Sequence, residues 1–274
     1  MTTFSKQGFN AAKYFAHRPM YNQAAYTHIL NSHHGNVDLA LDVGCGPGTV
    51  AAHLAKQFHQ VIGVDPSPSM IKVAQQEQQL PNVTFCQAYG EALPVADHSV
   101  DLITVAQSLH WLDPARFLAE VQRVLRPNGT LVAWGYMFGK MLGNEDTLVA
   151  ELGEGALGQY WEPNRAIATA GFVSWLPAFQ ATFKDVQHMS YPDPLLPCSK
   201  VLAVPWMDDS EMTLDQLVDY VKTWSSYKNW LDGNAGKDDV VDAFFKHRCP
   251  SLTGDSLVHI QWPHSVFIAS QPLD

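Results

Sequence analysis

Short apolar runs alternate with amphipathic stretches through the first half of the chain. The apolar runs predict strands, and the spacing of apolar residues in the stretches between them predicts helices. The expected strands are 39–43, 60–64, 83–86, 100–105 and 130–134, and the expected helices are 49–58, 67–79 and 114–124. Because strands that alternate with helices form a parallel sheet covered on both faces, this half predicts a doubly wound α/β domain.

The pattern is less regular in the second half. We expect further helices at 144–157, 164–170, 213–226 and 238–247, a strand at 181–190, and a closing strand within 256–270. Together with the first half, this predicts a mostly parallel seven-stranded sheet with a helical lid or insertion. The expected division is a helical lid segment at 1–38, an α/β domain at 39–190, a helical acceptor cap at 191–250, and a closing strand at 251–274.

Charge and composition narrow the choice of partners. The chain of 274 residues has a net charge of -10 and no basic cluster, which argues against nucleic acid or an anionic membrane as a partner. The four cysteines lack CxxC spacing and the twelve histidines form no HxH or HxxxH pattern, so we expect no metal. No apolar run is long enough for a signal segment or a membrane span. We therefore expect a cytoplasmic protein, monomeric or homodimeric, that acts on a small molecule.

A glycine-rich turn follows the first strand, in the segment LALDVGCGPGT at 39–49. Glycines there let a ligand lie against the backbone at the carboxyl end of the strand. The spacing is GxGxG rather than the GxGxxG of dinucleotide sites, and Asp42 precedes the first glycine. A carboxylate at this position repels a pyrophosphate but binds the ammonium group of an amino-acid tail, directly or through water. The turn therefore favours S-adenosylmethionine over NAD.

A second acidic residue, Asp65, ends the next strand. It lies about 20 residues after Gly46, the separation at which a carboxylate reaches the ribose hydroxyls in this topology. The alternative is that the segment Asp65-Pro66-Ser67 only caps the following helix. We expect the ribose contact, because the glycine turn stands upstream.

These segments, with GVDPSPSMI, GEALP and SLHWLDPARFLAEVQRVLRPNGTLV, resemble the class I S-adenosylmethionine-dependent methyltransferases that carry a methyltransferase type 11 domain. The resemblance covers 39–134, extends weakly to 18–21 and 223–225, and is closest to the trans-aconitate methyltransferase-like group of small-molecule enzymes. It implies that S-adenosylmethionine is the cofactor. The residues expected around the cofactor are Asp42, Gly44, Cys45, Gly46, Gly48, Thr49, Asp65, Pro66, Met70, Ala88, Tyr89, Glu91, Ala106, Gln107 and Ser108.

In that family the N-terminal helix and the helices after the fifth strand cover the sheet and form the acceptor pocket. The residues expected there are Tyr14, Arg18, Tyr21, Trp111, Trp134, Tyr136 and Arg165, with Lys13, Tyr160 and Trp161 as further candidates. His110 follows the fourth strand and is a candidate base. The alternative is a histidine that holds its loop through a hydrogen bond.

The nature of the acceptor decides whether a base is needed. A carboxylate has an ordinary pKa of about 4, so it is already ionised and needs no proton removed. The pocket would instead need cations to hold a second carboxylate, and Arg18 and Arg165 are the candidates. A phenol or an amine would give His110 a larger role. The favoured function is O-methyl ester formation on a small carboxylate, such as a trans-aconitate-like acid. Methylation of another oxygen, nitrogen or carbon acceptor is one alternative, and a non-catalytic S-adenosylmethionine-binding protein is another.

Overall fold

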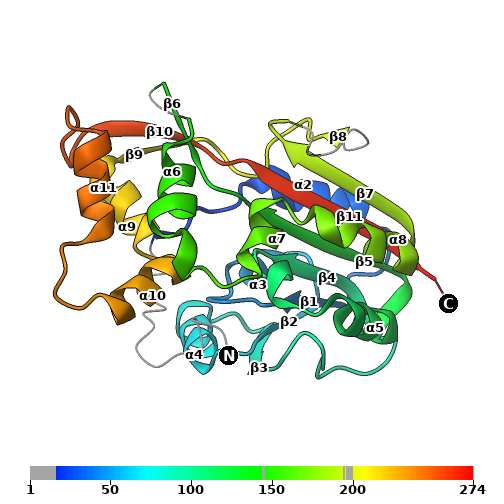
Figure 1. Cartoon of the computed structure of the whole chain (residues 1–274). Helices are drawn as coiled ribbons and strands as arrows, with labels where there is room; N and C mark the ends of the chain where they lie inside the picture. Colours follow the sequence, from blue (N-terminus) through cyan, green and yellow to red (C-terminus); the bar gives the residue numbers. More distant parts are fainter. Residues whose placement is uncertain (1–16, 144–145, 194, 196–199, 274) are drawn as a thin grey trace.

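An eight-stranded sheet forms the body of the molecule (Figure 1). The computed structural model describes residues 17–143, 146–193, 195 and 200–273. The strand order is β3-β2-β1-β4-β5-β11-β7-β8. The strands of this sheet are β1 (Leu39–Val43), β2 (Gln60–Asp65), β3 (Val83–Gln87), β4 (Val100–Ala106), β5 (Leu125–Tyr136), β7 (Phe183–Tyr191), β8 (Lys200–Val201) and β11 (His264–Pro272).

The prediction of a mostly parallel sheet is confirmed. Strands β1 to β5 pair in parallel, and β11 alone runs antiparallel to both of its neighbours, β5 and β7. The sheet has one strand more than expected, because β8 has two residues and such a short strand leaves no periodic pattern. β5 also begins earlier than expected: residues 125–129, which precede the strand expected at 130–134, belong to its irregular start, where the register to β4 shifts.

Helices cover both faces of this sheet (Figure 1). One face packs against α2 (Gln23–Ser32), α3 (Thr49–Leu54) and α4 (Pro68–Glu77). The other face packs against α5 (Pro114–Val124), α7 (Arg165–Thr169) and α8 (Leu176–Thr182). Side chains from alternate positions of β4 and β5 enter the two different clusters, as a strand that is buried on both faces requires.

A third hydrophobic cluster forms a cap beside the sheet, on the left in Figure 1. It contains residues from 136–161 as well as from 207–262, so two separate segments of the chain build it. Its elements are β6 (Lys140–Leu142), α6 (Leu148–Glu151), a π-turn at Leu152–Ala156, the short 3-10 helix η4 (Gly158–Tyr160), β9 (Ser210–Thr213), α9 (Leu214–Val221), α10 (Ser225–Gly233), α11 (Val240–Arg248) and β10 (Leu257–Gln261).

Two sequence predictions within the cap are wrong. The helix expected at 213–226 is two helices, because the Thr223 hydroxyl donates to the Tyr220 carbonyl and the next residue, Trp224, is extended. The expected closing strand is also two strands. β10 joins β6 and β9 in a small antiparallel sheet, and Pro263, which has no N–H to donate, separates β10 from β11.

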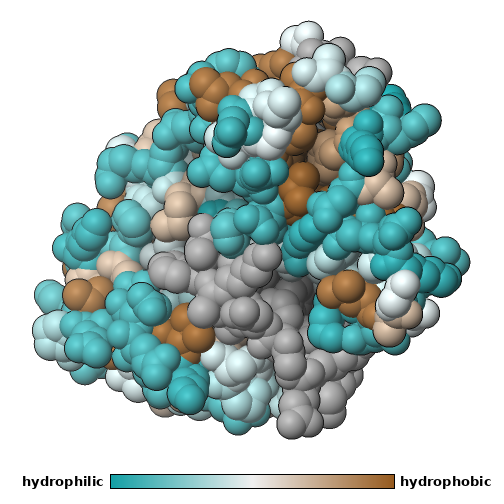
Figure 2. All heavy atoms as spheres, turned by 90° about the vertical axis from the view of Figure 1, so that its left-hand side faces the viewer, coloured by the Kyte–Doolittle hydropathy of each residue, from teal (hydrophilic) through white to brown (hydrophobic). Residues whose placement is uncertain are grey.

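The face of the cap that looks away from the sheet is mostly hydrophilic, with separate hydrophobic patches (Figure 2). Among the described helices, none is long and apolar enough to cross a membrane.

Candidate functional site

A cavity of about 770 Å³ lies at the carboxyl ends of β1, β2 and β4, next to residues 18–21, which precede α2. Parallel strands place their carboxyl ends at one edge, where ligands of open α/β sheets bind. The residues predicted from the sequence that line this cavity are Asp42, Gly44, Cys45, Gly46, Thr49, Asp65, Pro66, Met70, Tyr89, Glu91, Ala106, Gln107, Ser108, Arg18, Tyr21, Trp111 and Tyr136.

Two glycines with positive φ shape the glycine turn, for different reasons. Gly44 has a φ of +68°, and a Cβ there would lie 2.5 Å from the side chain of Ser108. Gly46 has a φ of +51°, and a Cβ there would meet no protein atom within 4 Å, because this glycine borders the cavity. The turn therefore leaves open backbone toward a ligand. Gly48 lies behind it as the residue before α3 and does not line the cavity.

Asp42 presents a buried carboxylate at the cavity wall. It is 1% exposed, and one of its oxygens accepts a hydrogen bond of 2.8 Å from the Thr104 hydroxyl. Its other oxygen, Oδ2, is buried without a partner among the described residues. Burial raises the pKa of Asp42 to about 7, although the bond from Thr104 lowers it. A buried oxygen of this kind requires a donor, and the ammonium group of an amino-acid tail would satisfy it.

Asp65 links the second strand to the glycine turn. Its two carboxylate oxygens accept from the backbone N–H of Gly46 at 3.0 Å and of Ser67 at 2.8 Å. Burial raises the pKa of this carboxyl above its ordinary value. The helix cap is Ser67, whose hydroxyl accepts from Met70 N, so the alternative role considered for this segment belongs to Ser67. Asp65 itself faces the cavity.

The loop after β3 forms another part of the cavity wall. Glu91 accepts a hydrogen bond from Asp113 N at 2.9 Å, which ties this loop to the start of α5. Tyr89 is 64% exposed, and its ring borders the cavity. Ala88 donates its N–H to the Asp65 carbonyl and does not line the cavity.

A smaller cavity of about 30 Å³ lies between the large one and the cap. Arg18, Gln107 and Trp111 line both cavities. The other residues around the small cavity are His110, Trp161, Glu162, Arg165, Tyr220, Trp224 and Ser225.

His110 is buried in this region, and its Nδ1 has no hydrogen-bond partner among the described residues. Burial, together with the nearby charges of Arg165 and Arg18, lowers its pKa to about 3. The imidazole is therefore neutral at physiological pH. The loop is held from another point, because Asn164 donates to the backbone carbonyl of His110 at 2.7 Å. A role as base and a role in holding the loop were both open from the sequence, and the low basicity disfavours the base.

The two arginines of the small cavity contact aromatic rings. Arg18 donates to the Tyr136 hydroxyl at 2.9 Å, and its guanidinium carbon lies 5.5 Å from the centre of the Tyr220 ring. The guanidinium of Arg165 lies 4.8 Å from Phe138 and 4.7 Å from Trp161. Stacking of this kind orients a planar cation, and Arg18 also donates to the Thr223 carbonyl at 3.4 Å.

One residue expected in the acceptor pocket lies elsewhere in the structure. Trp134 is fully buried in the sheet core, with its ring 5.3 Å from Tyr21 and 5.5 Å from Trp206. It lines neither of the two cavities. Tyr14 lies outside the described residues, as does Lys13.

Several residues that line the small cavity were not predicted from the sequence. Glu162 and Tyr220 come from segments with no motif, whereas Trp224 and Ser225 lie in a stretch of weak family resemblance. Only the packing of the cap onto the sheet brings these residues together. The weak family resemblance at 223–225 was therefore the one available signal in the sequence.

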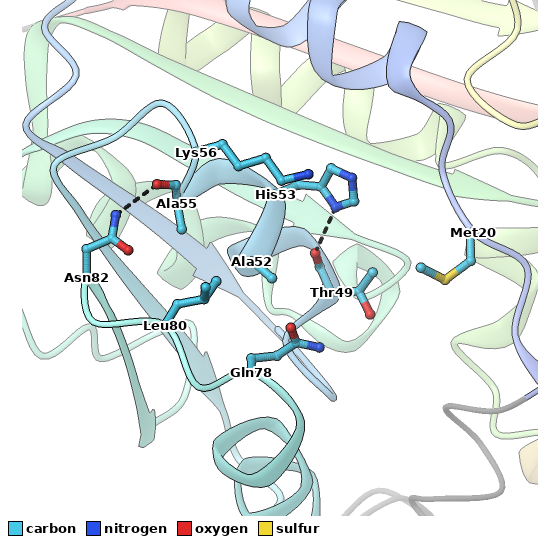
Figure 3. A pocket seen from close by; sticks show the side chains of 9 residues that line it. All are labelled: Met20, Thr49, Ala52, His53, Ala55, Lys56, Gln78, Leu80 and Asn82. Atoms are coloured by element: carbon cyan, nitrogen blue, oxygen red, sulfur yellow. Dashed lines mark hydrogen bonds between the residues drawn. The ribbon is translucent and has the colours of Figure 1, made fainter.

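A separate groove of about 330 Å³ runs along the outer side of α3, and Met20 and Thr49 line both this groove and the large cavity (Figure 3). Two of its polar side chains already bond to the backbone: Asn82 donates to the Ala55 carbonyl at 2.8 Å, and the His53 ring contacts the Thr49 carbonyl. We assign no ligand to it.

The burial of His110 predicts an acid-dependent loss of stability. The unfolded chain binds a proton near the ordinary pKa of 6.5, whereas folded His110 does so only near 3. Stability from this residue is therefore complete above pH 6.5 and is lost as the pH falls toward 3, by about 1.4 kcal/mol per pH unit.

The measurement is urea unfolding between pH 4 and 7. Asp42, whose pKa is raised, acts in the opposite direction in this range, so we compare wild type with His110→Asn rather than interpret one curve. The variant should lose less stability with acid, and His59→Asn, at a side chain that is 74% exposed, is the control. Parallel curves for wild type and His110→Asn would contradict the prediction.

Sequence similarity to known proteins extends over most of the chain. Residues 41–133 match the family model described as a methyltransferase domain. A Dictyostelium discoideum protein named as a methyltransferase is 32% identical over 86% of this chain and 82% of its own length. A Saccharomyces cerevisiae protein named as an S-adenosylmethionine-dependent methyltransferase is 27% identical over 89% of this chain and 88% of its own. Among solved structures, a type II methyltransferase from Anaeromyxobacter dehalogenans has a TM-score of 0.71 at 26% identity, and the match covers 92% and 97% of the two chains.

Proposed function

This chain belongs to the S-adenosylmethionine-dependent methyltransferases, and we propose that it methylates a carboxylate of a small organic acid. The resemblance noted in the sequence is thus confirmed at the level of the family, the enzyme class and the cofactor. The acceptor and the roles of single residues are our proposal. A non-catalytic binding protein is not favoured, because the relatives are named as methyltransferases.

We assign the two ends of the cofactor to the two strand-end carboxylates. The unpaired oxygen of Asp42 supports a contact to the ammonium group, whose charge would favour ionised Asp42 despite its burial. Asp65 faces the same cavity from the next strand, which supports a contact to the ribose hydroxyls. When bound, the cofactor supplies a methyl group already activated by its sulfonium.

The residues of the chain then have to orient the acceptor and exclude water. Holding two reactants in contact lowers the barrier by roughly 7 to 11 kcal/mol without covalent help from the protein. A carboxylate needs no proton removed, which suits a site where His110 is too weakly basic to remove one. An amine or a phenol as acceptor would give His110 a larger role, which its low basicity does not support.

The observation that carries the carboxylate proposal is the pair of arginines around the small cavity. Arg18 and Arg165 both lie close enough to His110 to lower its pKa, so their charges converge on one point. Glu162, whose carboxylate accepts from the Ser225 hydroxyl, is the one acidic residue in the described lining. Within this described lining, two guanidinium groups against one carboxylate give a net positive charge, which supports an anionic acceptor.

The test is transfer of a radiolabelled methyl group to a panel of compounds. The panel holds mono-, di- and tricarboxylic acids, with trans-aconitate among them, the amide of each acid as a matched uncharged control, and sets of phenols and amines. We expect label in base-labile methyl esters of acids and none in the amides. Transfer only to phenols, amines or carbon would contradict the carboxylate acceptor while leaving the methyltransferase activity itself intact.

A further inference from the structure

Gln107 has an unusual backbone for a residue at the end of a strand. It follows β4 directly and has a φ of +54°, in the left-handed region that few residues other than glycine adopt. Its N–H still donates to the Trp134 carbonyl of β5 at 2.8 Å. The chain thus leaves the sheet at this residue, whose N–H still makes a main-chain hydrogen bond to β5.

The side chain of Gln107 replaces the main-chain bonds that this departure removes. In a parallel ladder, alternate residues of a strand face the same neighbour, so Tyr136 faces β4 as Trp134 does. The Gln107 Oε1 accepts from Tyr136 N at 2.8 Å, and its Nε2 donates to the Tyr136 carbonyl at 3.0 Å. One amide group therefore satisfies both polar groups of the Tyr136 backbone, each of which would otherwise be buried without a partner.

The surroundings leave little freedom for this amide. A Cβ on Gly135 would lie 2.4 Å from the Gln107 Oε1 and 2.6 Å from the Phe172 ring, so glycine is needed beside it. On the other side, the turned backbone leads to Ser108, whose hydroxyl donates to the Val43 carbonyl next to the glycine turn at 2.9 Å.

Tyr136 in turn holds a residue that borders both cavities. Its hydroxyl accepts the 2.9 Å hydrogen bond from Arg18, and Gln107 and Arg18 both line the large and the small cavity. Both polar atoms of the Gln107 amide are thus engaged by Tyr136, while the residue also lines the large cavity as expected for a cofactor neighbour.

We propose that Gln107 is a positioning residue for the acceptor: it fixes Tyr136, and through the Tyr136 hydroxyl it fixes Arg18 where the two cavities meet. The assignment rests on the proposed function only in that Arg18 contacts the acceptor. It separates two tasks at the end of β4, because the Ser108 hydroxyl supports the cofactor turn whereas the side chain of Gln107 supports the acceptor cavity.

The test compares Gln107→Met, which removes both hydrogen bonds, with wild type. We expect the KM for the acceptor to rise about tenfold or more, which corresponds to a loss of roughly 1.4 kcal/mol or more of binding free energy. The Kd of S-adenosylhomocysteine, measured by calorimetry, should change less than about twofold. Gln122→Met is the matched control. Gln122 lies on α5 and also donates to a backbone carbonyl, that of Leu273, but it lines neither cavity. An unchanged KM, or a cofactor Kd that rises with the KM, would overturn the proposal.

A double-mutant cycle tests the route through Tyr136. In a Tyr136→Phe background, Gln107→Met should raise the KM less than about twofold, because the link to Arg18 is already lost. An equal effect in both backgrounds would contradict this route. The assays use whichever compound wild type methylates, so a failed carboxylate panel and a failed Gln107 assignment are distinguishable. A crystal structure of Gln107→Met gives a readout without turnover: an intact Arg18 to Tyr136 hydrogen bond would overturn the proposal.

Discussion

Replacing Asp65 with alanine is expected to weaken the binding of S-adenosylmethionine by roughly 10- to 100-fold. The reason is that a hydrogen bond to a charged group contributes about 1.5 to 3 kcal/mol, and the ribose offers two hydroxyls to this carboxylate. Asp65 also accepts from the N–H groups of Gly46 and Ser67, so the variant loosens the glycine turn in addition. Titration calorimetry with S-adenosylhomocysteine measures the change.

Asp65→Asn separates the two contributions. Asparagine keeps one oxygen that can accept from the backbone but lacks the charge, so we expect an affinity between those of wild type and Asp65→Ala. Thermal unfolding of each variant without ligand shows how much of the loss is structural. Wild-type affinity in Asp65→Ala would remove the ribose assignment.

Replacing Arg18 with methionine is expected to lower kcat/KM for an acid acceptor by about 100-fold, close to the upper end for one hydrogen bond to a charge. Methionine keeps much of the apolar contact with Tyr220 but removes the guanidinium and its bond to Tyr136. Initial-rate kinetics with saturating cofactor measure the loss.

Two further variants control this result. Arg18→Lys keeps the charge without the planar fork, so partial activity is expected if bidentate geometry matters. Arg116→Met, at an exposed position on α5, changes the same residue type away from both cavities and should leave kcat/KM unchanged. If Arg18→Met retained wild-type kinetics, Arg18 would not hold the acceptor.

The cofactor half of the molecule was predictable because its signals are local. The glycine turn, Asp42 and Asp65 lie at the ends of strands whose apolar runs are visible in the sequence. The parallel pairing of β1 with β2 and β4 then brings them to one edge. A single topological rule was sufficient.

The acceptor side was less predictable because contacts distant in sequence create it. Glu162 and Tyr220 meet at the small cavity only after two segments of the cap have packed together. Short strands such as β6 carry too few residues for a period of two to be recognised. The sequence also could not decide the state of His110, since its basicity depends on burial.

Gln107 illustrates a third kind of limit. Its position after β4 was correctly placed beside the ligand cavities, but a glutamine that replaces backbone bonds cannot be distinguished in a sequence from one that contacts a ligand.

The most direct measurement is a crystal structure of the protein with S-adenosylhomocysteine. We expect the ribose hydroxyls on Asp65, the amino group directed at the unpaired oxygen of Asp42, and the sulfur facing the place where Arg18 and Gln107 join the two cavities. A nucleoside bound elsewhere, or an Asp42 oxygen that still contacts neither ligand nor water, would contradict the central claim that these two carboxylates hold opposite ends of the cofactor.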